Sequence, residues 1–176
     1  MSVEIKEYHD NLVKRFLKEK QRLRDVFSSE IVIEHVGSSA IGIGGKNIVD
    51  ILVGVKSTDE MVKVRDLLTS VGYREGHDTH PDRIFMARRI NDDGTDRETG
   101  EGDYHVHIVV VGSSEYLNML GFRDYLRAHP DEAKEYYETK KVLAKKAGFN
   151  RKKYKALKSE YVKALIEKTK KQWFLI

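Results

Sequence analysis

Cysteine is absent from the 176 residues, which excludes a disulfide scaffold, a thiolate zinc site and a cysteine nucleophile. Only two prolines occur, and no apolar run approaches the roughly 18 residues that a membrane-spanning helix needs. The N-terminus lacks the apolar core of a signal peptide, so the cytoplasm is the expected location. There are no internal repeats and no low-complexity linkers, and the length predicts a single domain over residues 1–176.

Charge is unevenly distributed along the chain. The formal net charge is +4, but residues 131–172 hold 14 Lys and Arg against 6 Asp and Glu, a local balance of +8, which leaves −4 for the rest. A basic segment attracts nucleic acid or another polyanion, and Tyr154 and Tyr161 lie among the lysines of residues 151–171. The same pattern fits a solvated helix face with both tyrosines in a core stripe, so we do not favour nucleic acid as a partner.

The hydrophobic periodicity predicts helices before, between and after a small sheet. Strands are expected over residues 31–36, 48–55, 83–90 and 103–111, which are rich in β-branched and apolar residues. Helices are expected over residues 3–27, 59–70 with Asp59 as the cap, 114–128, 130–148 and 151–171. The acidic linker after residue 90 predicts a hairpin with a mobile tip. The fold class is therefore α/β or α+β, with a mixed sheet of about four strands in residues 31–112 and a helical part over 114–176.

The stretch that joins the first two strands carries the clearest chemical signal. Gly37, Ser38 and Ser39 form a turn after the first strand and begin a short helix, and Lys46 follows in the same loop. Glycine allows a ligand to approach the backbone, serine hydroxyls and free amides hold a phosphate, and a lysine offsets its charge. We therefore expect these residues to bind an anionic substrate.

Asp50 is the one acid in the apolar run of residues 48–55. An ionised carboxylate in such a run costs several kcal/mol unless it is paired or bound to a metal. One interpretation is a Mg²⁺ site shared with substrate phosphates. The other is an ion pair of Asp50 with Lys46, Arg83 or a histidine.

His105 and His107 are two residues apart on a predicted strand, so their side chains project from one face. With Asp50, and with His35 if its strand is adjacent, they make a set that suits a transition metal or a general base near pH 7. The alternative is that they are hydrogen-bonded partners of Asp50 or Glu34 without a metal. A second pair, His77 and His80, lies before Pro81 and is interpreted as a loop feature.

Arginines provide further candidate anion ligands. Arg123 and Arg127 are four residues apart on a predicted helix, so they share a face and can clamp a phosphate or a carboxylate. The alternative is a surface pair between Asp124 and Arg127, which contributes little to stability. Arg83, at the start of the third strand, is a further candidate.

The spacing from Gly37-Ser38 to Asp50-Ile51-Leu52-Val53 resembles the signature of the nucleotidyltransferase superfamily. More narrowly, the chain resembles the GrpB family of predicted nucleotidyltransferases from its first helix to about residue 167. The motifs that carry this resemblance are Ile33 to Ser39, Lys46 to Val55, Gly72-Tyr73, His105-Val106-His107, Gly112-Ser113, Phe122 to Arg127, Ala133, Tyr136, Lys140, Leu143, Ala144, Tyr154 and Lys158-Ser159.

The resemblance implies a nucleotidyltransferase-like fold with a site between the Gly-Ser turn and the central strands. It implies an NTP substrate with Mg²⁺ or Mn²⁺, metal ligands at Asp50 and His107, and transfer of a nucleotidyl or related phosphoryl group to an unknown acceptor. Leu52 stands where the superfamily has its second acid, and histidines stand where a third is expected. A two-metal mechanism requires several oxygen ligands. The alternative function is therefore a binding module for a nucleotide or another anionic metabolite without turnover.

Overall fold

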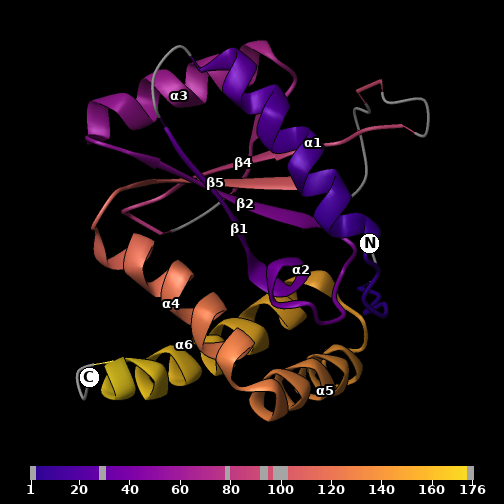
Figure 1. Ribbon diagram of the computed structural model, residues 1–176. Helices are drawn as coiled ribbons and strands as arrows, with labels where there is room; N and C mark the ends of the chain where they lie inside the picture. The colour runs from indigo at the N-terminus through magenta and orange to yellow at the C-terminus, as the bar shows by residue number, and fades with distance from the viewer. Residues whose placement is uncertain (1–2, 28–30, 78–79, 92–94, 97–102, 174–176) are drawn as a thin grey trace.

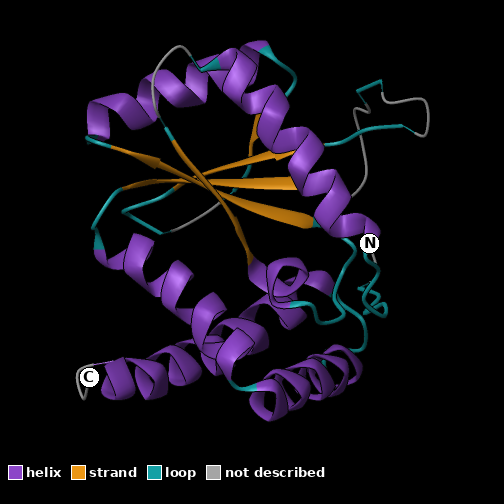
Figure 2. Cartoon of the chain, viewed as in Figure 1, coloured by secondary structure: helices purple, strands orange, loops and turns teal. Residues whose placement is uncertain are grey.

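A five-stranded mixed sheet forms the centre of the computed structural model, which describes residues 3–27, 31–77, 80–91, 95–96 and 103–173 (Figures 1 and 2). The strands are β1 (Val32–Val36), β2 (Val49–Val55), β3 (Arg74–Glu75), β4 (Ile84–Arg88) and β5 (Tyr104–Val110), in the order β1-β2-β5-β4-β3. The helices are α1 (Asn11–Val26), α2 (Gly37–Ile41), α3 (Thr58–Ser70), α4 (Ser114–Ala128), α5 (Pro130–Lys146) and α6 (Arg151–Trp173).

The mixed sheet predicted from the sequence is confirmed. β2 and β5 are parallel, whereas β1 pairs with β2, β4 with β5 and β3 with β4 in antiparallel fashion. The near-continuous burial of β2 matches its apolar sequence, because both of its faces are covered. The fifth strand, β3, was not expected from the sequence. It has only two residues and both are exposed, so no hydrophobic pattern indicates it.

Helices cover the two faces of the sheet differently. α1 and α3 pack on one face over a large apolar core that includes Leu23, Ile51 and Leu68. α4 lies on the other face, where Val36, Leu52 and Val109 form a smaller cluster. α5 and α6 pack against α4 below the sheet, so the chain after residue 114 builds a helical layer beside α2 (Figure 1).

Two predicted boundaries are wrong. Residues 3–10 are not helical, because Lys6 instead exchanges backbone hydrogen bonds with Gly45 and the amide of Val3 donates to Phe149. The cap of α3 is Ser57 rather than Asp59, since the Ser57 hydroxyl accepts from the amide of Glu60. The predicted hairpin tip and the end of the apolar C-terminus fall in residues 92–94, 97–102 and 174–176, outside the described residues. Within the described part of the chain, no helix is long and apolar enough to cross a bilayer.

Candidate functional site

Asp50 lies between two histidines on the face of the sheet that α4 covers. The parallel register of β2 and β5 places Asp50 opposite His105 and Leu52 opposite His107. The Oδ1 atom of Asp50 is 3.3 Å from Nδ1 of His105 and 3.6 Å from Nε2 of His107, and 26% of the Asp50 side chain is exposed. Of the two interpretations of Asp50, pairing with histidines is therefore seen directly.

Opposing effects set the protonation of this group of side chains. Burial by itself raises the pKa of Asp50, but hydrogen bonds from His105 and His107, together with their charge, hold that pKa well below its ordinary value. Burial lowers the pKa of His107, against the attraction of Asp50. At neutral pH the site therefore presents an ionised carboxylate beside a neutral His107, whose Nδ1 atom is buried without a hydrogen-bond partner.

The Gly-Ser turn meets Asp50 directly. Gly37 has φ +70°, and a Cβ atom there would lie 2.5 Å from Oδ2 of Asp50. No other residue type fits both the backbone conformation and this close approach. The turn and the carboxylate, predicted from the sequence to form one site, are thus in contact.

Lys140 of α5 reaches Ser38 from a distant part of the chain. Its Nζ atom donates to Oγ of Ser38 over 2.8 Å and to the carbonyl oxygen of Gly44. The Lys140 side chain is almost completely buried, with 1% of its surface exposed. Burial and the neighbouring charge of Lys158 lower the pKa of Lys140 to about 7, against the attraction of Asp50. The phosphate-binding candidate Ser38 therefore lies beside a buried lysine whose hydrogen bonds to Ser38 and Gly44 go to a hydroxyl and a carbonyl oxygen rather than to a carboxylate of the described residues.

Tyr136 and Lys158 complete this group, which we call the lysine cluster (Ser38, Tyr136, Lys140 and Lys158). Tyr136 interacts with both Ser38 and Lys158, and the negative charge of an ionised Tyr136 is the main cause of the raised pKa of Lys158. The sequence analysis gave Tyr136, Lys140 and Lys158 no role in the site, although they belong to the motifs of the resemblance. The available signal was the presence of Lys140 on the buried face of α5, one turn after Tyr136.

Arg123 lies near the site but is bound within the protein. Its guanidinium contacts a carboxylate oxygen of Glu34 at 2.7 Å, the carbonyl oxygen of His35 at 3.0 Å and both carboxylate oxygens of Asp124. Arg127 donates to the carbonyl oxygen of Ala40 and lies 3.8 Å from Asp124. The two arginines thus hold α4 against β1 and α2, and both lie near the carboxylate of Asp124.

His35 does not join the other histidines, because its side chain points to the opposite face of the sheet. It stacks on Phe16 of α1 with ring centroids 4.4 Å apart and hydrogen-bonds to Oγ of Ser39 over 2.9 Å. Burial lowers the pKa of His35 to about 4. The hydroxyl of Ser39 is therefore bound to a buried neutral imidazole and supports the turn from behind.

The remaining candidates are spread around the site. Arg83 is paired with Glu115, and His80 lies 3.3 Å from the same carboxylate. His77 is exposed, in agreement with its interpretation as a loop residue. Lys46 lies half-buried in the loop between α2 and β2.

The fit to metal ions is limited by Leu52. Its side chain is fully buried in the cluster between the sheet and α4, so the second acidic position of the superfamily is part of the core here. Among the described residues, no three His, Asp or Glu side chains are arranged to hold a cation. Mg²⁺ usually keeps several waters and binds through one or two carboxylates plus substrate phosphates. Asp50 therefore suits one such ion shared with phosphates, whereas a pair of ions lacks ligands.

Comparison with solved structures defines the class. The fold is that of the nucleotidyltransferases: a structure of the Cid1 poly(U) polymerase bound to MgATP superimposes with a TM-score of 0.55 and 18% identity, over 83% of this chain and 46% of that one. A crystal structure of the conserved protein GrpB from Enterococcus faecalis superimposes more fully. Its TM-score is 0.80 at 26% identity, over 97% of this chain and 99% of that one.

Sequence comparison gives the family. The family model for GrpB protein matches residues 2–168, so the chain belongs to the GrpB family. It is 34% identical over 173 residues to UPF0157 protein YqkA of Bacillus subtilis, covering 97% of this chain but only 48% of that protein. It is 31% identical to the glutamate-rich protein GrpB of Alkalihalophilus pseudofirmus, over 90% of this chain and 91% of that protein. The chain thus spans about half the length of one relative and nearly all of the other.

Proposed function

We propose that this protein binds a nucleoside triphosphate at the Gly-Ser turn and transfers a nucleotidyl or related phosphoryl group to an acceptor. The observation that carries the proposal is the contact between Gly37 and Asp50, with the lysine cluster on the other side of Ser38. A triphosphate on this turn would have two cations on one side and a carboxylate on the other. That is the charge arrangement that binding and polarising a phosphate chain requires.

Each residue then has a defined task. Lys140 and Lys158 offset phosphate charge, and the hydroxyl of Ser38 changes its partner from Lys140 to a phosphate oxygen. Asp50 would hold a divalent cation, Mg²⁺ or Mn²⁺, which supplies charge neutralisation to the phosphates when bound. His105 or His107 lies next to Asp50 and would accept the proton of the acceptor hydroxyl, a role that imidazole side chains commonly have in general base catalysis.

A second candidate function is nucleotide binding without turnover. The burial of Leu52 favours it, because Asp50 is left without the second carboxylate of a two-ion site. The lysine cluster and the Gly-Ser turn serve binding equally well in both cases. The two functions therefore share a ligand and differ only in the chemical step.

The test begins with binding. Thermal unfolding is followed with each NTP, with and without Mg²⁺ or Mn²⁺, for the wild type, Asp50→Asn and the matched control Asp59→Asn at an exposed position. A ligand at 100 times its dissociation constant adds about 2.7 kcal/mol to stability. We expect a metal-dependent shift that Asp50→Asn loses and Asp59→Asn keeps. The absence of a shift with all NTPs and metals would contradict both candidate functions.

Turnover is then measured with the NTP that binds. The protein is incubated with that NTP, labelled in separate reactions at the α-phosphate and at the γ-phosphate, and with fractionated cell extract as a source of acceptors. If the wild type transfers the label to an acceptor and Asp50→Asn does not, the enzymatic function is supported. Binding without transfer from any NTP or metal supports the second candidate.

A further inference from the structure

The turn between α5 and α6 is rich in basic residues and, unlike an ordinary solvated helix face, has no acidic residues among them. Residues 139–159 contain nine Lys and Arg and no Asp or Glu. Two of the nine, Lys140 and Lys158, belong to the lysine cluster. Six others are exposed: Lys145, Lys146, Arg151, Lys152, Lys153 and Lys155. No carboxylate within this stretch of sequence offsets their charges.

An aromatic side chain lies at the centre of this basic turn. Phe149 is 49% exposed and has φ +58°, a conformation that is rare for a bulky residue. Its backbone is held on both sides, because its amide donates to Ala144 over 2.9 Å and its carbonyl oxygen accepts from the amide of Val3 over 2.8 Å. The ring is thus kept at the surface by a fixed backbone, an outlier that points to a function for the ring.

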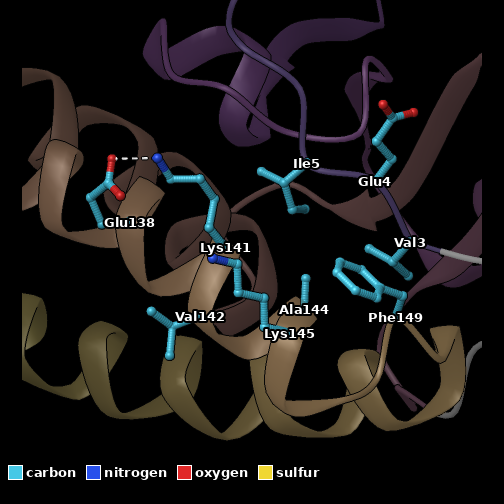
Figure 3. Close-up of a pocket in the computed structure, with 9 residues that line it drawn as sticks. All are labelled: Val3, Glu4, Ile5, Glu138, Lys141, Val142, Ala144, Lys145 and Phe149. Carbon is cyan, nitrogen blue, oxygen red and sulfur yellow. Dashed lines mark ion pairs between the residues drawn. The ribbon is translucent and has the colours of Figure 1, made fainter.

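Phe149 also forms one wall of an open cavity of about 560 Å³ between the N-terminal segment and α5 (Figure 3). Val3, Ile5 and Val142 supply the other apolar surfaces. Lys141 and Lys145 line the same cavity together with Glu4 and Glu138, and Lys141 is paired to Glu138 at 2.7 Å. An apolar cavity with an aromatic wall, and with Lys145 between it and the basic turn, is suited to a flat, apolar group attached to an anion.

We propose that this surface binds single-stranded nucleic acid: a base stacks on Phe149 in the cavity, and flanking phosphates contact Lys145, Arg151 and Lys152. Stacking on an aromatic ring beside a basic groove is how proteins bind single strands without sequence preference. We favour a single strand over a duplex, because the bases of a duplex stay stacked on one another. We favour it over an acidic peptide, because such a peptide has no base to stack on Phe149. The inference concerns Lys145 near the end of α5, Phe149 in the turn, and Arg151 and Lys152 at the start of α6, and it does not rest on the proposed NTP site.

Fluorescence anisotropy with a labelled mixed-sequence 16-nucleotide RNA, in 50 to 200 mM salt and without nucleotide, tests this binding. Phe149→Asn removes the ring and keeps a residue type that tolerates positive φ. Phe149→Tyr keeps the ring as its control. Lys145→Gln/Lys152→Gln removes two of the proposed phosphate contacts, and Lys14→Gln/Lys63→Gln is the matched change at exposed positions of α1 and α3. Thermal melts check that every variant is folded.

We expect Phe149→Asn to weaken binding by about 5- to 150-fold with an unchanged salt slope, as for the loss of one stacked base. Removing two phosphate contacts should reduce the slope of log K against log salt by about 1.4. Phe149→Tyr, the charge control and Asp50→Asn should bind like the wild type, which separates this surface from the NTP site. Equal binding by Phe149→Asn and the wild type would overturn the proposal. So would equal competition by inorganic polyphosphate or poly-glutamate, or the absence of RNA binding at 50 mM salt.

Discussion

Lys140 and Ser38 lie 102 residues apart in the chain, yet Nζ of Lys140 donates a hydrogen bond to Oγ of Ser38 over 2.8 Å. This contact joins the helical layer formed by α4, α5 and α6 to the turn that follows β1. It gives the Gly-Ser turn a buried cation, which neither the turn nor the sheet supplies. A buried ammonium without a carboxylate in contact costs stability, so its presence is a reason to look for an anionic ligand.

The first prediction is that Lys140→Met separates stability from ligand binding. Because burial lowers the pKa of Lys140 to about 7, the unfolded chain binds more protons than the folded protein between about pH 7 and 10.5. The free energy of unfolding therefore rises with pH across that window because of Lys140. Methionine removes this pH dependence and also the cost of burying a charge. Loss of the hydrogen bond to the carbonyl oxygen of Gly44 offsets this stabilisation by about 1–3 kcal/mol.

Urea unfolding at pH 7 and pH 9 measures the change, with exposed Lys63→Met as the control. We expect Lys140→Met to be at least as stable as the wild type at pH 7 while losing the NTP-induced shift in melting temperature. A loss of more than about 2 kcal/mol together with normal NTP binding would show that Lys140 serves the fold alone.

The second prediction concerns the approach of Gly37 to Asp50. Gly37→Ala introduces both a strained positive φ and a Cβ atom 2.5 Å from the carboxylate. Gly112 has φ +79° and open space around it, so Gly112→Ala carries the strain alone. Urea unfolding should show a loss of about 1 kcal/mol for Gly112→Ala and a clearly larger loss for Gly37→Ala. Equal losses would mean that the turn moves away from Asp50 without cost.

The third prediction is that the second acid of the superfamily cannot be restored by one substitution. Leu52 is fully buried between Val36 and Val109, so Leu52→Asp places an unpaired carboxylate in an apolar cluster. We expect a loss of at least 3 kcal/mol, by burial of charge and by loss of packing. Chemical denaturation measures it against Leu17→Asp on α1, where the side chain is exposed and the loss should be small. A stable Leu52→Asp protein that gains metal affinity would instead show that the site retains room for a second ligand.

The fourth prediction is a pH dependence that arises from His35. Its pKa is lowered from 6.5 to about 4 in the folded protein, so the unfolded chain binds a proton that the folded protein does not. The contribution of neutral His35 to the free energy of unfolding is fully present above pH 6.5 and falls as the pH decreases toward 4. At 1.36 kcal/mol per pH unit, the loss is about 2 kcal/mol at pH 5.

Melting curves from pH 7.5 to 5 compare the wild type with His35→Gln and with His9→Gln at an exposed position. His35→Gln should be less stable at pH 7.5, because its stacking on Phe16 is lost, and should show a flatter decline toward pH 5. His9→Gln should follow the wild type. A decline that is equally steep in all three proteins would assign the pH dependence to other groups.

The order of the helices and of the four longer strands, the mixed sheet and the closeness of Gly37 to Asp50 could be predicted from the sequence. Its buried strand, its Gly-Ser turn and the two-residue spacing of His105 and His107 are local patterns, and local periodicity fixes which residues share a face. The contact of Asp50 with both histidines follows from such patterns once β2 and β5 are neighbours. The resemblance to the GrpB family added the expectation of a nucleotidyltransferase-like fold.

The position of the lysine cluster at the site depends on tertiary packing. Whether Lys140 faces solvent or Ser38 depends on how α5 packs below α2, and no local pattern encodes that packing. The same holds for Arg123, whose guanidinium pairs with Glu34 on β1. His35 and Ser39 were candidates for the ligand side of the turn and instead bind each other behind it, because adjacent residues of a strand point to opposite faces.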